Sequence, residues 1–320
     1  MERAELDVPE GATELLRRHP SPVILTGPAR QKEGGQPVEM RRKISFQEVP
    51  VEAVAAFWDR RPCNVRHSPK EVGTLDYFNE VETRKYVVEP HILRFADFPR
   101  WCGKRVLEVG CGIGTDTINF ARQGASVTAV ELSQQSLSIA RRRAEVFGVQ
   151  DRVRFYQGNA EELATFVPVE PYDLVYCFGV IHHTPHPERV LEQMRRYLSP
   201  GGILKVMVYH RYSWKVFLIL LTYGKGQFWR LSELVAQHSE AQTGCPITYT
   251  YTPRELRHRL ECFGFRTMEM WVDHIFPYRI PDYVRYRNTK AWLWRWTPQP
   301  IFRWLERHFG WHLCATAEAS

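Results

Sequence analysis

Arg105-Val-Leu-Glu-Val-Gly-Cys-Gly-Ile-Gly-Thr-Asp116 is the stretch of sequence that decides the fold. Its first half is a short apolar run rich in β-branched residues, which is typical of a buried strand. Glycines then follow at alternate positions, Gly110, Gly112 and Gly114. They remove side chains from a strand-to-helix turn, so a ligand can lie against bare backbone beside the N-terminus of the helix that begins near Thr115. The stretch therefore predicts a ligand site at the carboxyl end of the first strand of an α/β sheet.

The spacing of these glycines separates two classes of cofactor. A dinucleotide fingerprint requires G-x-G-x-x-G, and Thr115 stands where its third glycine would be. The pattern here is instead an acidic residue on the strand, Glu108, followed by G-x-G-x-G. It resembles motif I of the class I S-adenosylmethionine (SAM) dependent methyltransferases, in which the acidic residue helps to place the methionine part of SAM. The resemblance implies that the cofactor is lined by Glu108, Gly110, Cys111, Gly112, Gly114, Thr115 and Asp116.

The next strand supplies a second predicted cofactor contact. After a helix from Thr115 to Gln123, the segment Ser126–Leu132 reads as a strand that ends in Glu131, about twenty residues beyond the glycine turn. A carboxylate at the tip of the second strand accepts hydrogen bonds from ribose hydroxyls in either cofactor class. Glu131 and its neighbour Leu132 are therefore predicted to lie against the cofactor.

The third and fourth strands complete the predicted cofactor site. A strand from Val153 to Gln157 leads into Asn159, Ala160 and Glu161. The resemblance implies that the polar residue and its neighbours here contact the adenine. The family more often has Asp at this position, but the amide of Asn159 can still serve the adenine amino group. A fourth strand ends at Phe178, which is expected at the same edge of the sheet.

Further motifs narrow the resemblance. Two motifs are similar to those of the ubiquinone and menaquinone biosynthesis branch of these methyltransferases. The first is Tyr172-Asp-Leu-Val175 followed by the pair His182-His183, and the second is Leu198-Ser-Pro-Gly-Gly202 before a strand from Ile203 to Tyr209. The units agree with the family in order from about Gly103 to His210. The resemblance implies an α/β fold: a Rossmann-like, seven-stranded, mostly parallel sheet with helices on both faces, plus N-terminal helices and C-terminal lid insertions.

Four segments are expected along the chain. Residues 1–50 form an N-terminal extension that is partly irregular, and residues 51–100 form a helical cap. The SAM-binding core occupies 101–210. Residues 211–320 supply the rest of the sheet, at about 252–272 and 311–317, together with aromatic and basic insertions that form a substrate lid. Within them, Thr252-Pro-Arg-Glu255 is a helix start, with Thr as N-cap and Glu three residues later.

The charge of the chain is concentrated in its last third. The formal net charge is +7. Acidic and basic residues are equal in number in 1–100 and again in 101–200, so the whole positive excess lies in 201–320. This segment also holds most of the ten tryptophans. Such a surface suits an anionic or aromatic small substrate, an anionic membrane surface or a nucleic acid. Nucleic acid is the least favoured, since no RNA-binding module is recognisable. Peripheral membrane contact stays open, as does a solvated basic surface around a Trp-rich core.

Cysteine usage and the start of the chain predict the compartment. The seven cysteines are scattered without metal-ligand spacing, which favours reduced thiols in a cytoplasm. The N-terminus lacks the apolar run that a secretory signal requires, so no such signal is predicted. The longest apolar stretch, Trp214–Tyr223, is too short to span a bilayer. No metal site is predicted, because the histidines at 182, 183 and 186 lack a carboxylate partner in the sequence.

The predicted chemistry makes few demands on the protein. The methyl group of a sulfonium is already activated, so the acceptor needs in-line approach, close positioning and exclusion of water. A general base is needed only where the acceptor holds a proton. Candidate catalytic residues are His210, His182 and His183, and candidate substrate contacts are Tyr209, Tyr278 and Tyr77, of which Tyr77 also fits a core position.

Three functions therefore remain open. The first is a SAM-dependent methyltransferase with a small-molecule acceptor, for which aromatic and prenylated compounds are considered. The second is an NAD-type oxidoreductase, which Thr115 disfavours. The third is a protein that binds SAM without turnover. The sequence indicates neither the acceptor atom nor the oligomeric state.

Overall fold

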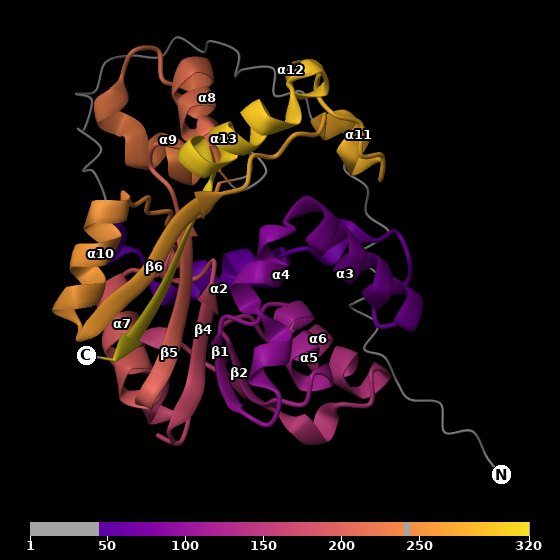
Figure 1. The fold of residues 1–320 in the computed structure, drawn as a ribbon, viewed down its shortest axis with the longest axis vertical. Coiled ribbons are helices and arrows are strands. Elements are labelled where there is room, and N and C mark those ends of the chain that lie inside the picture. Colours follow the sequence, from indigo (N-terminus) through magenta and orange to yellow (C-terminus); the bar gives the residue numbers. More distant parts are fainter. Residues whose placement is uncertain (1–44, 240–243, 320) are drawn as a thin grey trace, which may run out of the picture. The chain divides into compact units, whose positions relative to one another are not determined.

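A single seven-stranded sheet organises the molecule in the computed structural model, which describes residues 45–239 and 244–319 (Figure 1). The strand order is β3-β2-β1-β4-β5-β7-β6, and only β7 runs antiparallel to its neighbours. The strands are β1 Arg105–Val109, β2 Ser126–Glu131, β3 Val153–Gln157, β4 Tyr172–Phe178, β5 Leu198–Tyr209, β6 Phe265–Asp273 and β7 His312–Ala319. The predicted mostly parallel, Rossmann-like fold class is confirmed.

Helices cover both faces of this sheet. The helices are α2 Val51–Arg60, α3 Leu75–Val88, α4 His91–Ala96, α5 Thr115–Arg122, α6 Gln134–Val146, α7 Pro187–Tyr197, α8 Trp214–Tyr223, α9 Leu231–His238, α10 Pro253–Cys262, α11 Ile280–Val284, α12 Trp292–Trp296 and α13 Gln299–Phe309. Short helical turns are η1 Phe46–Glu48, η2 Val65–His67, η3 Phe98–Trp101, η4 Gln150–Arg152, η5 Ala160–Thr165, η6 Ile181–His183 and η7 Phe228–Arg230.

Alternation along the strands divides the core into two layers. On β1, Val106 belongs to one apolar cluster and Leu107 to the other, because successive side chains of a strand point to opposite faces. Helices α4, α5 and α6 contribute to the cluster that contains Val106, whereas α7 and α10 contribute to the one that contains Leu107. The strands between them are therefore buried on both faces, which is why they read as continuous apolar runs.

The fifth strand begins earlier than the sequence predicts. Ser199-Pro-Gly-Gly202 is expected to be a turn, but β5 starts at Leu198, which already pairs with Tyr172. The register then shifts, and regular pairing resumes between Leu174 and Ile203. The segment is thus an irregularity within a strand. Gly201 permits it, because its φ of +72° lies in the left-handed region.

The N-terminal helices pack against this core. Thr74 caps α3 by accepting a hydrogen bond from the backbone of Tyr77, and Pro90 separates α3 from α4. Helix α2 packs on α6. The N-terminal extension expected at 1–50 lies almost entirely outside the described residues.

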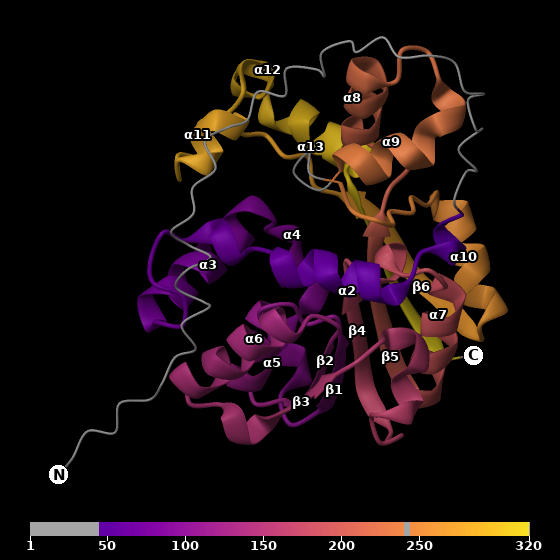
Figure 2. The same cartoon turned by 180° about the vertical axis from the view of Figure 1, so that it is seen from behind.

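The remaining helices gather at one edge of the sheet. Views from both sides place α8, α9, α12 and α13 beyond the ends at which β5 and β6 finish (Figures 1 and 2). Helix α10 instead covers a face, and Thr252 caps it in the predicted reciprocal arrangement with Glu255. No helix among the described residues is long and apolar enough to cross a membrane.

Candidate active site

The glycine turn between β1 and α5 is built on three left-handed backbone positions. The φ angles of Gly110, Gly112 and Gly114 are +79°, +54° and +76°. A Cβ at Gly110 would lie 2.1 Å from Val180 Cγ2, and one at Gly114 would lie 2.9 Å from Ala140 Cβ. A Cβ at Gly112 would meet nothing within 4 Å. The outer glycines therefore serve packing, while Gly112 is where bare backbone borders open space.

Glu131 lies directly against this turn. Its Oε2 accepts a hydrogen bond from the backbone of Gly112 at 2.8 Å, and its Oε1 accepts one from Ser133 at 2.9 Å. Burial raises the pKa of Glu131, and these backbone donors oppose the rise. The structure thus brings the tip of β2 to the glycine turn, and Leu132 lies half-buried beside it.

Glu108 is buried on β1 behind the turn. The hydroxyl of Thr117 donates a hydrogen bond to its carboxyl group. Burial and the nearby carboxylate of Asp116 raise the pKa of Glu108 to about 8. A carboxyl group so placed can be ionised by an approaching cation, because an opposite charge favours the charged form.

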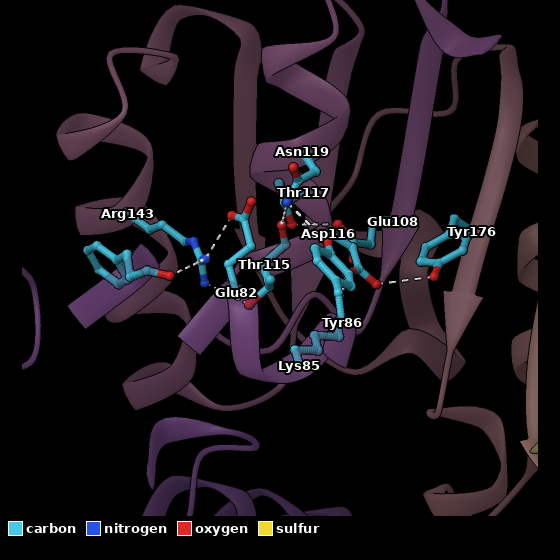
Figure 3. A network of polar contacts seen from close by, with 11 residues as sticks. Glu82, Lys85, Tyr86, Glu108, Thr115, Asp116, Thr117, Asn119, Arg143 and Tyr176 are labelled. Carbon is cyan, nitrogen blue, oxygen red and sulfur yellow. Dashed lines mark hydrogen bonds and ion pairs between the residues drawn. The ribbon is translucent and has the colours of Figure 1, made fainter. Parts of the chain in front are cut away.

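Asp116 is the centre of a buried polar network (Figure 3). Its Oδ1 accepts hydrogen bonds from Lys85 Nζ at 2.7 Å and from the Tyr86 hydroxyl at 2.9 Å. Its Oδ2 accepts one from the Tyr176 hydroxyl at 3.1 Å. Burial lowers the pKa of Lys85, but the carboxylates of Asp116, Glu89 and Glu108 together outweigh this effect and the pKa lies above its ordinary value. Asp116, predicted to contact the cofactor, therefore joins α3 to α5 in this structure.

Arg143 provides a second link in the same region. It is fully buried, and its guanidinium donates to the Thr115 hydroxyl at 2.6 Å and to the Phe78 carbonyl at 3.0 Å. A third contact joins it to Glu82 at 3.2 Å (Figure 3). Sequence reasoning missed Arg143, as it missed Lys85. Each pairs with a residue some thirty positions away, and helical or strand periodicity carries no signal for such a pair.

The segment predicted to contact the adenine follows β3. Asn159 Oδ1 accepts a hydrogen bond from the backbone of Glu161 at 3.0 Å and so caps η5. Glu161 Oε1 in turn accepts one from the backbone of His186 at 2.8 Å. Ala160 is buried, whereas Phe178, at the end of β4, is half-buried and stacks on Tyr176.

The His-His pair is buried beneath aromatic rings. His182 is fully buried, and neither of its ring nitrogens has a hydrogen-bond partner among the described residues. Its ring centroid lies 3.8 Å from that of Tyr209, which stacks on Trp311 from the other side at 4.0 Å. Burial holds the pKa of His182 well below its usual value, so the ring is neutral. His183 Nδ1 lies 2.7 Å from the Ile247 carbonyl.

The other predicted residues lie in different surroundings. His210 is buried, and its Nδ1 donates to the Gly310 carbonyl at 3.2 Å. Tyr77 is fully buried, donates its hydroxyl to the Val65 carbonyl at 2.8 Å and packs in a cluster with Ile113 of the glycine turn. These contacts give Tyr77 the core position that the sequence left open. Tyr278 is half-buried and stacks near Tyr283.

Comparison with known proteins identifies the central segment. Residues 106–202 match the family model of a methyltransferase domain. A ubiquinone biosynthesis O-methyltransferase of Aeromonas salmonicida is 34% identical over 119 residues, which is 37% of this chain and 48% of the relative. An uncharacterised protein of Synechococcus is 38% identical over 107 residues, 33% of this chain and 25% of that protein. The chain thus spans about half or less of the length of the curated relatives it matches.

Solved structures share the fold over a larger part of the chain. A geranyl diphosphate C-methyltransferase from Streptomyces coelicolor has a TM-score of 0.53 at 15% identity and covers 87% of this chain and 99% of its own. A magnesium protoporphyrin IX methyltransferase from Synechocystis with bound SAM has a TM-score of 0.51 at 13% identity, with the same coverage. At such identities the likeness concerns the fold. The sequence match and the motif at Glu108 therefore identify residues 106–202 as a methyltransferase domain that resembles class I SAM-dependent methyltransferases, and the fold around it is shared with solved methyltransferases.

Proposed function

We propose that this protein transfers the methyl group of SAM to a small-molecule acceptor. The observation that carries the proposal is the contact between Glu131 and the backbone of Gly112. It joins the carboxylate at the tip of β2 to the one glycine of the turn that borders open space. A ribose bound there would donate hydrogen bonds from its hydroxyl groups to the Glu131 carboxylate, in place of the backbone N–H groups that donate to it now. The rest of the cofactor would lie along the turn.

The proposed contacts divide SAM into three parts. Glu108 and the turn from Gly110 to Asp116 serve the methionine part, Glu131 and Leu132 the ribose, and Asn159 to Glu161 with Phe178 the adenine. In this arrangement the carboxyl groups of Glu108, Asp116 and Glu131 would lie around the cationic ligand. The rise in the pKa of Glu108 fits this role, because a bound sulfonium or ammonium would offset the cost of ionising a buried carboxyl group.

An aromatic or prenylated acceptor is the finer part of the proposal. Strands β4 and β5 end at Phe178 and Tyr209, and helices α8, α9, α12 and α13 lie beyond these ends (Figure 1). Flat apolar molecules pack well against such rings. Relatives named for ubiquinone biosynthesis and for geranyl diphosphate methylation act on molecules of these kinds, which supports the proposal by analogy.

Positioning, more than acid–base catalysis, would carry the reaction. The enzyme must hold the acceptor atom in line with the sulfonium methyl group and keep water out. His210 and the pair His182-His183 remain the proposed candidates for accepting a proton. All three rings are buried, and burial lowers the pKa of His182 and of His210, which suits a base only if the acceptor reaches the ring.

Calorimetric titration with SAM, S-adenosylhomocysteine and NAD tests the proposal first. We expect binding of the first two at micromolar Kd and no heat with NAD. Binding of NAD alone would indicate that the glycine turn binds a dinucleotide and would favour the oxidoreductase hypothesis. Methyl transfer to fractions of a cell extract is then followed with SAM that carries a labelled methyl group. Binding of SAM with no transfer to any fraction would support the third hypothesis, a protein that binds SAM without turnover.

A glycine substitution localises the site. We expect Gly112→Val to abolish SAM binding while thermal unfolding stays cooperative, because the new side chain enters open space on the cofactor side. Gly148→Val is the matched control, since Gly148 also has a positive φ, of +65°, and a Cβ there would meet nothing within 4 Å. The control keeps SAM affinity within about twofold. Equal SAM affinity in both variants would contradict a cofactor site at this turn.

A further inference from the structure

Two histidines and a glutamate meet at the edge of the sheet outside the proposed cofactor contacts. Glu89 ends α3, His274 follows β6 and His312 begins β7. One ligand atom from each of these residues lies within 4.8 Å of the others. His274 and His312 are buried and their rings stack with centroids 4.7 Å apart. Three segments distant in sequence thus direct two imidazoles and one carboxylate to one point.

The hydrogen bonding of His312 leaves one ring nitrogen facing the carboxylate. Its Nδ1 lies 2.9 Å from His91 Nε2, and its Nε2 lies 3.7 Å from Glu89 Oε1. If Nδ1 donates to His91, the lone pair of Nε2 is directed toward Glu89. A histidine ligand held by a hydrogen bond at its other nitrogen is the usual arrangement around protein-bound metals.

The backbone at His274 is a second, independent observation. Its φ is +73°, in the left-handed region that side chains other than glycine adopt at a cost. The hydrogen bond from its backbone N–H to Asp273 Oδ1 at 2.7 Å, and the one that its carbonyl accepts from Trp311, hold this conformation. Strained non-glycine positions cluster at functional sites, and here the strain turns an imidazole toward the other two residues.

From this juxtaposition we infer that Glu89, His274 and His312 bind a divalent first-row transition metal. Two neutral imidazoles and a carboxylate suit zinc or iron(II) and leave further coordination positions open. Bonds of about 2.1 Å at angles near 90–110° would bring the ligand atoms to about 3.0–3.5 Å from one another. The side chains would therefore close in by up to roughly 1–2 Å when the ion binds.

The place of the cluster suggests what an open position would hold. The ring of His312 lies 5.6 Å from that of Phe178 and 6.2 Å from that of Tyr209, centroid to centroid. Those rings stand where the acceptor is expected. The metal would take an oxygen of the acceptor as a ligand and lower the pKa of its hydroxyl group. This last step rests on the proposed function, whereas the metal site itself does not.

Metal analysis of the untagged full-length protein tests the site, since a histidine tag would itself bind metal. We expect about one equivalent of zinc, iron, manganese, cobalt or nickel per chain by plasma mass spectrometry. After treatment with a chelator, cobalt(II) should return with visible absorption bands typical of nitrogen and oxygen ligands. Less than a tenth of an equivalent, together with no cobalt spectrum, would overturn the inference.

Variants then show which residues hold the metal. Glu89→Gln keeps the size of the side chain, removes the charge and should weaken cobalt binding at least tenfold; His274→Gln should do the same. His258→Gln is the control, because His258 and Cys262 form an exposed pair, with 3.7 Å between Nε2 and Sγ, that could capture metal adventitiously. Loss of metal in the control variant and retention in Glu89→Gln would contradict the site.

Two measurements keep this inference separate from the proposed function. SAM is titrated into the chelated protein, and cobalt into the protein without SAM. Binding of SAM with no metal in either experiment refutes the metal site and leaves the methyltransferase. Binding of metal without any affinity for SAM refutes the proposed methyltransferase function and leaves the metal site.

Discussion

Glu108 is a carboxyl group that the fold holds in its protonated form. Its pKa of about 8 in the folded protein lies above the ordinary value of 4.5, so the native state binds the proton more tightly than the unfolded chain. This contribution to stability is complete below about pH 4.5 and is lost as the pH rises through about 8, at up to about 1.4 kcal/mol per pH unit.

The variant Glu108→Gln tests this in the SAM-free protein. Glutamine resembles the protonated carboxyl group in shape and does not titrate. We therefore expect the free energy of unfolding of the wild type, minus that of the variant, to decrease steadily from pH 5 to pH 8 in urea titrations. Contributions from groups that do not interact with Glu108 cancel in the difference. Parallel pH profiles would show that Glu108 is already ionised.

Gly110 depends on the absence of a side chain. The Cβ of Gly110→Ala would lie 2.1 Å from Val180 Cγ2 and would also occupy a φ of +79°. We expect a loss of about 2–4 kcal/mol in unfolding free energy from the sum of both costs. Gly103→Ala, with a φ of +70° and nothing within 4 Å, reports the backbone cost alone and should lose about 1 kcal/mol.

A double-mutant cycle separates the two costs at Gly110. Because Val180→Ala removes the clashing methyl groups, the pair should show a coupling energy of at least about 1 kcal/mol in the favourable direction. Additive effects would mean that the loss at Gly110 comes entirely from its backbone conformation.

At the scale of elements, Arg143 ties three helices together. It extends from α6 to Thr115 on α5 and to Phe78 and Glu82 on α3. Removing a buried cation leaves these acceptors without their donor, so Arg143→Met should cost about 3 kcal/mol in urea unfolding. Its neighbour Arg142 is exposed and pairs only across one helical turn, so Arg142→Met should change stability by less than about 0.5 kcal/mol. Equal losses would exclude this role for Arg143.

The elements that sequence predicts best are those with local signals. The strand from Arg105 to Val109 and the capped helix after Thr252 appear in the structure at the predicted places, because apolar runs and caps lie within a few residues of one another. Ser199-Pro-Gly-Gly202 was misjudged as a turn, since its glycines and proline also suit an irregular strand. The glycine turn and Glu131 were brought together as predicted, whereas their roles toward a cofactor stay predictions.

Long-range pairs escaped prediction for a physical reason. Lys85 and Asp116 are 31 positions apart, and His91 and His312 are 221 apart. Their meeting depends on how whole elements pack, which periodicity does not encode. A buried lysine or a set of separate histidines therefore looks in sequence like ordinary surface residues.

At the scale of the whole molecule, basic and aromatic residues share one part of the chain. The formal charge excess of +7 lies in residues 201–320, and Trp292 and Trp296 on α12 are 78% and 71% exposed. Aromatic rings and basic groups together favour the surface of an anionic bilayer. We predict that the protein sediments with vesicles containing phosphatidylglycerol, less with neutral vesicles, and progressively less as salt is added.

A double variant tests the aromatic part of this surface. Replacing both tryptophans, Trp292→Ser and Trp296→Ser, should reduce sedimentation with anionic vesicles at least tenfold. Val169→Ser is the control, because Val169 is 51% exposed and precedes β4, whose start lies at the other edge of the sheet. Equal binding to neutral and anionic vesicles, or an equal loss in both variants, would refute membrane contact through α12.

The antiparallel strand β7 has a consequence for synthesis on the ribosome. β7 pairs with β5 on one side and β6 on the other, and nothing else joins those two strands in the sheet order. While the polypeptide is still being made, β5 and β6 have emerged but each shows an open row of backbone donors and acceptors. Such edges invite pairing with other nascent chains, so the interval before β7 arrives is when this protein most needs a chaperone.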